Sequence, residues 1–243
     1  MATASLTKLA KVSALAMGAT MLGRTLMKRS RRYRLIGKNA LVTGGARGLG
    51  LDIARQLVLK GANVAIIARD PSEIARALVD LRQRRDSASV QVVGQVCDLQ
   101  DPAAIDAMLA AVRGTLGPID VLVNNAGMMQ VGPLDSMSYA DFERAMQLHC
   151  FAPLRTMLGV RADMRARGSG RIANIASIGG IVAVPHLLPY SASKFALMGL
   201  SQGMGAELAA EGIVVSTIAP GLMRTGSPRG ATFKGDHEKE YAW

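Results

Sequence analysis

A glycine-rich loop between a strand-length apolar run and an amphipathic helix is the feature that most constrains the fold. The apolar run covers Asn39–Thr43, residues 44–50 contain four glycines, and a helix is predicted to begin at Leu49 and to end at Lys60. Glycines in such a loop let backbone N–H groups reach an anion at the helix N-terminus, where the helix dipole favours negative charge. The segment predicts a pyrophosphate-binding strand–loop–helix unit. A tight turn without a ligand is the alternative.

The rest of the chain alternates between strand and helix patterns. Short apolar, β-branched runs are separated by longer amphipathic stretches, without repeats or low-complexity linkers. This alternation predicts an α/β fold of the Rossmann type, a doubly wound parallel sheet with helices on both faces. The length of 243 residues fits a single domain of that kind. Strands are predicted at Asn39–Thr43, Asn63–Ala68, Val90–Cys97, Ile119–Val123, Arg171–Ala176 and Ile213–Ile218, and helices at Leu49–Lys60, Glu73–Arg85, Pro102–Thr115, Asp141–Arg165 and Pro189–Ala210.

A Tyr-x-x-x-Lys pair and a preceding serine suit proton transfer to or from an alcohol oxygen. Tyr190 and Lys194 are four residues apart on one face of a predicted helix, and Ser177 lies thirteen residues before the tyrosine. A tyrosine with its usual pKa of about 10 is a poor base near neutral pH until a nearby positive charge stabilises its phenolate. The trio predicts an acid–base site, whereas an isolated Tyr-x-x-x-Lys is common on ordinary helices.

Four motifs in a fixed order resemble those of the short-chain dehydrogenase/reductase family. They are Thr-Gly-x-x-x-Gly-x-Gly at 43–50, Asn-Asn-Ala-Gly at 124–127, Tyr-x-x-x-Lys at 190–194 and Pro-Gly-x-x-x-Thr at 220–225. The resemblance, which covers Leu35 to Thr225, implies an oxidoreductase that transfers a hydride between a nicotinamide and a carbonyl or secondary-alcohol carbon. It implies that Tyr190 is the acid/base, that Lys194 lowers its pKa and binds the nicotinamide ribose, and that Ser177 orients the substrate oxygen. The cofactor-binding residues that it implies are Thr43, Gly44, Gly48, Leu49, Gly50, Asp98, Leu99, Asn125, Ala126, Gly127, Tyr190, Lys194, Pro220, Gly221 and Thr225.

The end of the second predicted strand sets which nicotinamide cofactor is expected. An acid there hydrogen-bonds the ribose hydroxyls of NAD and repels the 2′-phosphate of NADP. This chain has Ala68 at that position, followed by Arg69, and Arg47 in the glycine loop is a second guanidinium that can pair with the phosphate. NADP(H) is therefore favoured over NAD(H). Asp70, directly after Arg69, is the group that could neutralise it.

Two departures from the family pattern bear on activity. His149 aligns with an asparagine that usually holds a water between the lysine and solvent, and it is either a proton-relay residue or a packed helix histidine. Only 22 residues follow Gly221, so the last helix and the seventh strand are expected to be absent, and the sixth strand is expected to form a sheet edge. The chain is then a truncated product or part of a longer protein. A catalytically impaired, NADP(H)-binding scaffold or sensor at a membrane is the alternative to an enzyme.

The basic charge is concentrated in a leader, residues 1–38, ahead of a catalytic domain predicted over 39–243. The net charge is +11, and the leader has nine Lys or Arg and no acid, so the rest of the chain is nearly neutral and nucleic-acid binding is not expected. Apolar residues at helical spacing, followed by clustered cations, predict a helix on an anionic membrane surface. A cleaved targeting segment and a helix packed on the domain are the alternatives. The uncharged stretch 12–23 is too short to span a bilayer.

The remaining expectations concern substrate, partners and compartment. The substrate is a small carbonyl or alcohol compound, the long helices can mediate a homo-oligomer, and no side chains have metal-ligand spacing. Cys97 and Cys150 are expected to be buried, reduced thiols, which fits a cytoplasmic protein. If the leader binds a membrane, the protein is expected to be peripheral on that membrane. The substrate pocket is expected to be apolar, lined by Met128, Met129, Ile181, Val182, Val184, Leu187 and Leu188.

Overall fold

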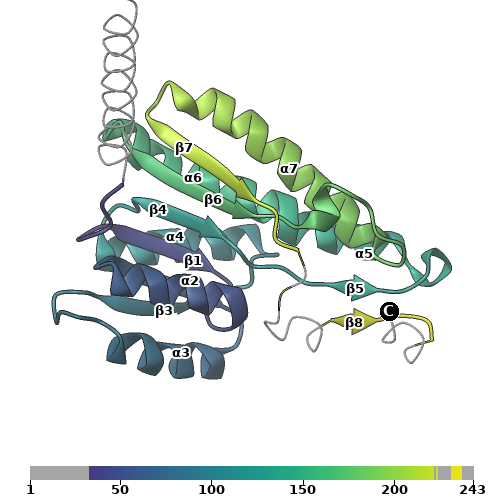
Figure 1. The fold of residues 1–243 in the computed structure, drawn as a ribbon, viewed down its shortest axis with the longest axis horizontal. Helices are drawn as coiled ribbons and strands as arrows, with labels where there is room; N and C mark the ends of the chain where they lie inside the picture. Colours follow the sequence, from purple (N-terminus) through teal and green to yellow (C-terminus); the bar gives the residue numbers. More distant parts are fainter. Residues whose placement is uncertain (1–32, 222, 224–230, 237–243) are drawn as a thin grey trace, which may run out of the picture. The chain divides into compact units, whose positions relative to one another are not determined.

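The computed structural model describes residues 33–221, 223 and 231–236, so most of the predicted leader and Thr225 lie outside the described residues. The chain divides into Met1–Arg34 and a larger unit that begins at Leu35. In the larger unit, strands and helices alternate (Figure 1). Its main strands are β1 (Asn39–Thr43), β2 (Asn63–Ala68), β3 (Val92–Val96), β4 (Val121–Asn124), β6 (Gly170–Ile175) and β7 (Ile213–Ile218), and its helices include α2 (Gly48–Leu59), α3 (Pro71–Gln83), α4 (Pro102–Leu116) and α7 (Leu188–Ala209).

These strands form a six-stranded sheet in the order β3-β2-β1-β4-β6-β7, and every neighbouring pair is parallel (Figure 1). From β1 the chain builds outward through β2 to β3, and from β4 it builds in the other direction through β6 to β7. The connections therefore diverge between β1 and β4, which opens a crevice at the carboxyl ends of these strands, where such folds bind ligands. The predicted doubly wound α/β sheet is confirmed.

Both faces of the sheet are buried at its central strands, β1, β2 and β4. Leu41 and Leu122 belong to a core cluster with residues of α4, α7 and α6 (Ala152–Ala166). Val42 and Ile66 point to the opposite face, because successive strand residues alternate, and they are also fully buried beside α2 and α3. Strands covered on both sides need apolar residues at nearly every position, which explains the continuous apolar runs in the sequence.

The helix predicted over Asp141–Arg165 changes its hydrogen-bond pattern in the middle. It consists of α5 (Tyr139–Met146), a five-residue π-helical turn (Gln147–Phe151) and α6. Pro153, in the first turn of α6, has no N–H to donate to the carbonyl four residues earlier, which accounts for the altered hydrogen-bond pattern. The predicted long helix is therefore present, and it contains a π-helical turn that was not predicted from the sequence. His149 lies inside the π-helical turn.

A second sheet, not predicted from the sequence, pairs β5 (Gln130–Val131) with β8 (Thr232–Phe233). The fully buried carboxylate of Asp141 anchors the segment that carries β8. It accepts hydrogen bonds from Lys234 Nζ, from the Ser138 N–H at 2.7 Å and from the Ser138 hydroxyl at 2.8 Å. This ion pair joins residues 93 positions apart and holds the segment after β7 against the start of α5.

Within the described residues, β7 is an edge strand of the six-stranded sheet. Its Val214 and Ile218 side chains are about half exposed, as expected at an edge. No helix in the described part of the chain combines the length and apolarity needed to cross a bilayer.

Candidate active site

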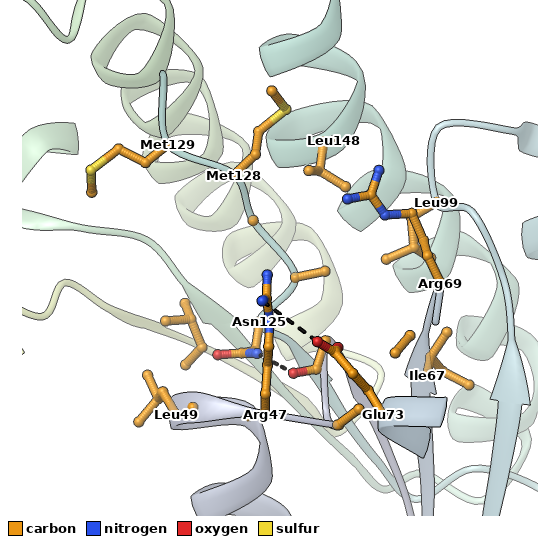
Figure 2. Close-up of a pocket in the computed structure, with 18 of the residues that line it drawn as sticks. Arg47, Leu49, Ile67, Arg69, Glu73, Leu99, Asn125, Met128, Met129 and Leu148 are labelled. Atoms are coloured by element: carbon orange, nitrogen blue, oxygen red, sulfur yellow. Dashed lines mark hydrogen bonds and ion pairs between the residues drawn. The ribbon is translucent and has the colours of Figure 1, made fainter. Parts of the chain in front are cut away.

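A cavity of about 670 Å³ lies at the carboxyl ends of the strands (Figure 2). Its walls are the glycine loop after β1, residues 68–70 after β2, residues 97–100 after β3, residues 125–129 after β4 and the start of α7. Thr43, His149, Ser177, Pro220 and Gly221 lie outside this lining. The predicted site residues that line the cavity are Gly44, Arg47, Gly48, Leu49, Gly50, Arg69, Asp98, Leu99, Asn125, Ala126, Gly127, Tyr190 and Lys194.

The start of α2 leaves backbone N–H groups available to an anion. The helices α3 and α4 begin with the carboxylates of Asp70 and Asp101, which accept hydrogen bonds from first-turn amides. By contrast, α2 follows Arg47, whose side chain makes no capping bond, and its first turn contains no acidic residue. An uncapped helix N-terminus at a cavity suits a phosphate group, because both the free N–H groups and the helix dipole favour negative charge. The residues present therefore fit a dinucleotide cofactor.

Gly44 and Gly50 let the loop close against the segment after β4. A Cβ on Gly50 would lie 2.1 Å from the Gly44 carbonyl oxygen and 2.5 Å from Asn125 Nδ2, and Gly44 has a φ of +63°. Asn125 Nδ2 donates to the carbonyls of Thr43 and Gly44, at 3.1 Å each. The buried Thr43 hydroxyl accepts from the backbone N–H groups of Asn125 and Ala126. Thr43 thus shapes the site from beneath and does not line it.

Two guanidinium groups and one carboxylate gather at the rim near the end of β2. Arg47 Nη1 lies 3.6 Å from Glu73 Oε1, and Arg69 lines the same cavity (Figure 2). Asp70, the residue expected to neutralise Arg69, accepts a hydrogen bond from the Ser72 N–H at 2.7 Å as the N-cap of α3. The carboxylate beside Arg69 is thus engaged with the helix backbone. Glu73 was missed, although its position in the first turn after β2 was an available signal.

Tyr190 and Ser177 form a polar pair. A Cβ added to Gly179 would lie 3.2 Å from Tyr190 Cε1 and 3.6 Å from Ser177 Oγ, so the two side chains lie close together, and the Ser177 hydroxyl, just after β6, accepts from the Gly179 N–H at 3.1 Å. Burial raises the pKa of Tyr190 above its usual value, and the nearby Ser177 hydroxyl offsets this only in part. The tyrosine is therefore protonated near neutral pH and is able to donate a proton.

Lys194 is buried beside the tyrosine, but its amine contacts the backbone. Nζ donates to the Ile175 carbonyl at 2.9 Å and lies 5.8 Å from the centroid of the Tyr190 ring. Burial lowers the pKa of Lys194 to about 8. The expected lowering of the Tyr190 pKa by Lys194 is not found in this structure. The amine donates to the Ile175 carbonyl rather than to the phenol, and the burial of Tyr190 raises the pKa of the phenol.

His149 lies next to these residues and is only 1% exposed. Its Nε2 is 3.0 Å from the Met128 backbone nitrogen, and its Nδ1 is 2.8 Å from Ser193 Oγ. Its ring meets the Tyr190 ring edge to face, with 5.5 Å between centroids. Burial, followed by the nearby charge of Lys194, holds the pKa of His149 well below its usual value. The imidazole is therefore neutral near pH 7.

The apolar part of the cavity differs from the predicted set. Met128 and Met129 line it, as expected, together with Leu148 and Met223, which the sequence motifs did not single out. Cys97 also lines it, and burial raises the pKa of this thiol to about 11, so it is not a nucleophile near neutral pH. The remaining predicted residues lie outside the lining; most are solvent-exposed, namely Ile181, Val182, Val184 and Leu188, and Leu187 is half-buried.

Comparison with known proteins gives consistent matches. The profile of the family described as short chain dehydrogenase matches residues 38–232. A protein of Streptomyces coelicolor assigned as a ketoacyl reductase is 39% identical over 189 residues, which cover 76% of this chain and 70% of the relative. A solved variant of actinorhodin polyketide ketoreductase with NADPH has a TM-score of 0.75 and 37% identity, covering 79% of this chain and 73% of that chain. A gluconate 5-dehydrogenase of Burkholderia cenocepacia in complex with NADP and tartrate has a TM-score of 0.74 and 34% identity, covering 82% and 76%.

Fold, cavity and relatives together define an oxidoreductase that uses a nicotinamide dinucleotide and acts on CH–OH or C=O groups. The chain belongs to the short-chain dehydrogenase/reductase family.

Proposed function

We propose that this protein is an NADP(H)-dependent carbonyl reductase in which Tyr190 gives a proton to the substrate oxygen, and which runs in reverse as an alcohol dehydrogenase. The observation that carries the proposal is that Tyr190, with Ser177 close beside it, lines the same cavity as the glycine loop. Reduction of a ketone is supported by the relatives, which include an assigned ketoacyl reductase and a polyketide ketoreductase. Met128 and Met129 favour an apolar substrate.

The roles of the side chains follow from their environments. When bound, the cofactor supplies the hydride that adds to the carbonyl carbon. The protonated Tyr190 donates its proton to the carbonyl oxygen, which the Ser177 hydroxyl orients. Lys194, with its pKa near 8, is mostly positive at pH 7, and its proposed role is to bind the nicotinamide ribose at the cavity that it lines. A proton from solvent then restores the tyrosine.

The cofactor is NADP(H). Arg69 and Arg47 lie at the rim of the cavity, where guanidinium groups can pair with the 2′-phosphate that distinguishes NADP from NAD. The last residue of β2 is Ala68, whereas an acidic residue at this position selects NAD in this fold. The solved ketoreductase and gluconate dehydrogenase relatives contain NADPH and NADP, respectively.

Replacing Tyr190 with phenylalanine tests the acid–base role. The Tyr190→Phe variant keeps the ring that packs against His149 and loses only the hydroxyl. We expect turnover to fall by about 10²–10⁴-fold, the usual contribution of a positioned acid, while the NADPH dissociation constant stays within about twofold. The assay follows NADPH oxidation with a panel of ketones that includes the β-ketoester ethyl acetoacetate. Turnover within about tenfold of the parent on any accepted ketone would refute the role of Tyr190.

A catalytically impaired scaffold or sensor that binds NADP(H) is the second candidate. The observation in its favour is that both ring nitrogens of His149 are hydrogen-bonded within the protein, so the residue that replaces the family asparagine has no free site for a relay water. Tight NADPH binding without turnover of any ketone in the panel would support this candidate over the enzyme.

Partners beyond the substrate are also proposals. The basic leader, residues 1–38, is proposed to bring a cytoplasmic protein to an anionic membrane surface, with a targeting role as the alternative. A homo-oligomer is proposed to form through the long helices, where Phe151, Leu158 and Phe195 are about half exposed. Sedimentation analysis of the purified protein tests the oligomer.

A further inference from the structure

His149 connects two segments that both belong to the active site. Met128 follows β4 and lines the cavity, while Ser193 lies in the first turns of α7, between Tyr190 and Lys194. The imidazole bridges them through its two nitrogens, 3.0 Å from the Met128 nitrogen and 2.8 Å from Ser193 Oγ. A side chain from the α5–α6 region thus holds the loop after β4 against the helix that carries the tyrosine and the lysine.

The partners of the two nitrogens define the tautomer. A backbone N–H can only donate, so His149 Nε2 accepts from Met128 and carries no proton. The Ser193 hydroxyl donates to the Tyr190 carbonyl at 2.8 Å, so its oxygen is free to accept from His149 Nδ1–H. Each ring nitrogen of the neutral imidazole has one hydrogen-bonding site, and both are used.

The bridge lies against the reacting groups. The His149 ring meets the edge of the Tyr190 ring, and the Ser193 hydroxyl links it to the Tyr190 backbone. A Cβ placed on Gly127 would lie 3.2 Å from His149 Nε2 and 3.8 Å from Lys194 Nζ, so the loop, the histidine and the lysine meet at one point. A displacement of His149 would therefore move the loop relative to both Tyr190 and Lys194.

We propose that His149 is a positioning residue that clamps the 127–128 loop to the start of α7 and carries no proton between Lys194 and solvent. The clamp rests on the proposed function, since it positions Tyr190 for proton donation. A relay water would need a free nitrogen lone pair or N–H of the imidazole, and Met128 and Ser193 occupy both. The titratable groups that face His149 are Tyr190 and Lys194. Because His149 carries no proton in this proposal and Tyr190 lines the cavity, the proton that restores Tyr190 is proposed to arrive from the cavity.

Two substitutions separate a clamp from a relay. In His149→Gln, the amide oxygen can accept from the Met128 N–H and the amide nitrogen can donate to Ser193, but an amide does not titrate and cannot pass a proton. In His149→Phe, an aromatic ring remains at this position, but the hydrogen bonds to Met128 and Ser193 are lost. Amide hydrogen exchange at Met128, measured by NMR, reports the clamp directly. We expect this amide to exchange at least about tenfold faster in His149→Phe, because one buried hydrogen bond is lost, and nearly as in the parent in His149→Gln.

Kinetics provide the second readout. For His149→Phe we expect kcat to fall by about 10- to 100-fold, the effect of a small misplacement, with KM for NADPH within about threefold, and His149→Gln should recover most of kcat. The pH profile of kcat/KM should keep its shape in His149→Gln. Equal impairment of the two variants with restoration by added imidazole would overturn the clamp in favour of a relay. Parent-like Met128 exchange in His149→Phe would overturn it as well.

Two further variants keep the interpretation unambiguous. Ser193→Ala removes one side of the bridge while His149 stays, and we expect a smaller change in the same direction as His149→Phe. Tyr190→Phe leaves both bonds of His149 in place, so its Met128 exchange should match that of the parent. If Tyr190→Phe turns over normally, the proposed catalytic role fails, yet the exchange measurements still decide whether the clamp exists.

Discussion

Gly50 offers a direct test of how tightly the cofactor loop is packed. In most helices, Gly→Ala is stabilising by roughly 0.5–1 kcal/mol, because glycine loses more backbone entropy on folding. At Gly50 the added Cβ would lie 2.1 Å from the Gly44 carbonyl oxygen and 2.5 Å from Asn125 Nδ2. The first of these neighbours is backbone, so relief requires α2 to shift away from the loop.

The two effects can be weighed against each other. Overpacking of a tight site costs about 1–3 kcal/mol, and a clash with backbone belongs at the upper end. After subtraction of the helix-propensity gain, Gly50→Ala should lose about 2 kcal/mol of unfolding free energy, which lowers Tm by about 4–8 °C in a domain of this size. The same shift moves the loop amides at the N-terminus of α2, so NADPH affinity should fall by about tenfold or more, equivalent to about 1.4 kcal/mol.

Gly203 provides the matched control, since it lies inside α7 with no atom near the position of an added Cβ. Gly203→Ala should raise the unfolding free energy by about 0.5–1 kcal/mol and leave NADPH binding unchanged. Urea unfolding and fluorescence titration with NADPH measure both quantities. If Gly50→Ala is as stable as Gly203→Ala and binds NADPH like the parent, the close packing inferred for the loop is wrong.

Three further predictions address the cofactor, the acid limit of stability and the leader. Arg69→Asp should shift the cofactor preference from NADPH toward NADH, and Glu73→Gln should strengthen NADPH binding by freeing Arg47. If the unmodified protein binds NADPH and NADH with equal affinity in a fluorescence titration, the assignment of NADP(H) as the cofactor is refuted. Burial alone would raise the pKa of Asp141, but the hydrogen bonds from Lys234 and Ser138 outweigh burial and lower this pKa. The ionised Asp141 therefore stabilises the fold fully above the unfolded-state pKa of about 3.9, and this stabilisation is lost as the pH falls below that value. Asp141→Asn should therefore be less stable at pH 7 and lose less stability on acidification, measured by urea unfolding from about pH 7 to pH 3. The full chain should sediment with phosphatidylserine vesicles at low salt, because each cation near such a surface contributes about 1 kcal/mol to binding. A chain that starts at Leu35 should not sediment with the vesicles. Identical sedimentation of the two chains would exclude a membrane role for residues 1–34.

The sequence by itself determined the sheet and the order of the site motifs. The bounds of β1, β2 and β7 agree residue for residue with the runs predicted from the sequence. For β1 and β2 the reason is that strands buried on both faces need an apolar side chain at almost every position. The motifs follow strand ends, and parallel strands bring their carboxyl ends to one edge of the sheet. Glycine, tyrosine and lysine positions far apart in the chain could therefore be assigned to one cavity before any coordinates were known.

Only the tertiary structure decided how particular side chains are engaged. The contacts of His149 reach residues 21 and 44 positions away, and Asp141 pairs with a lysine 93 positions away. Glu73 rather than Asp70 meets a guanidinium, since the Asp70 carboxylate caps α3. Local patterns encode a helix or a strand through its period. Which long-range groups touch depends on how the elements pack, and packing also fixes burial, which here raises the pKa of Tyr190 and lowers that of Lys194.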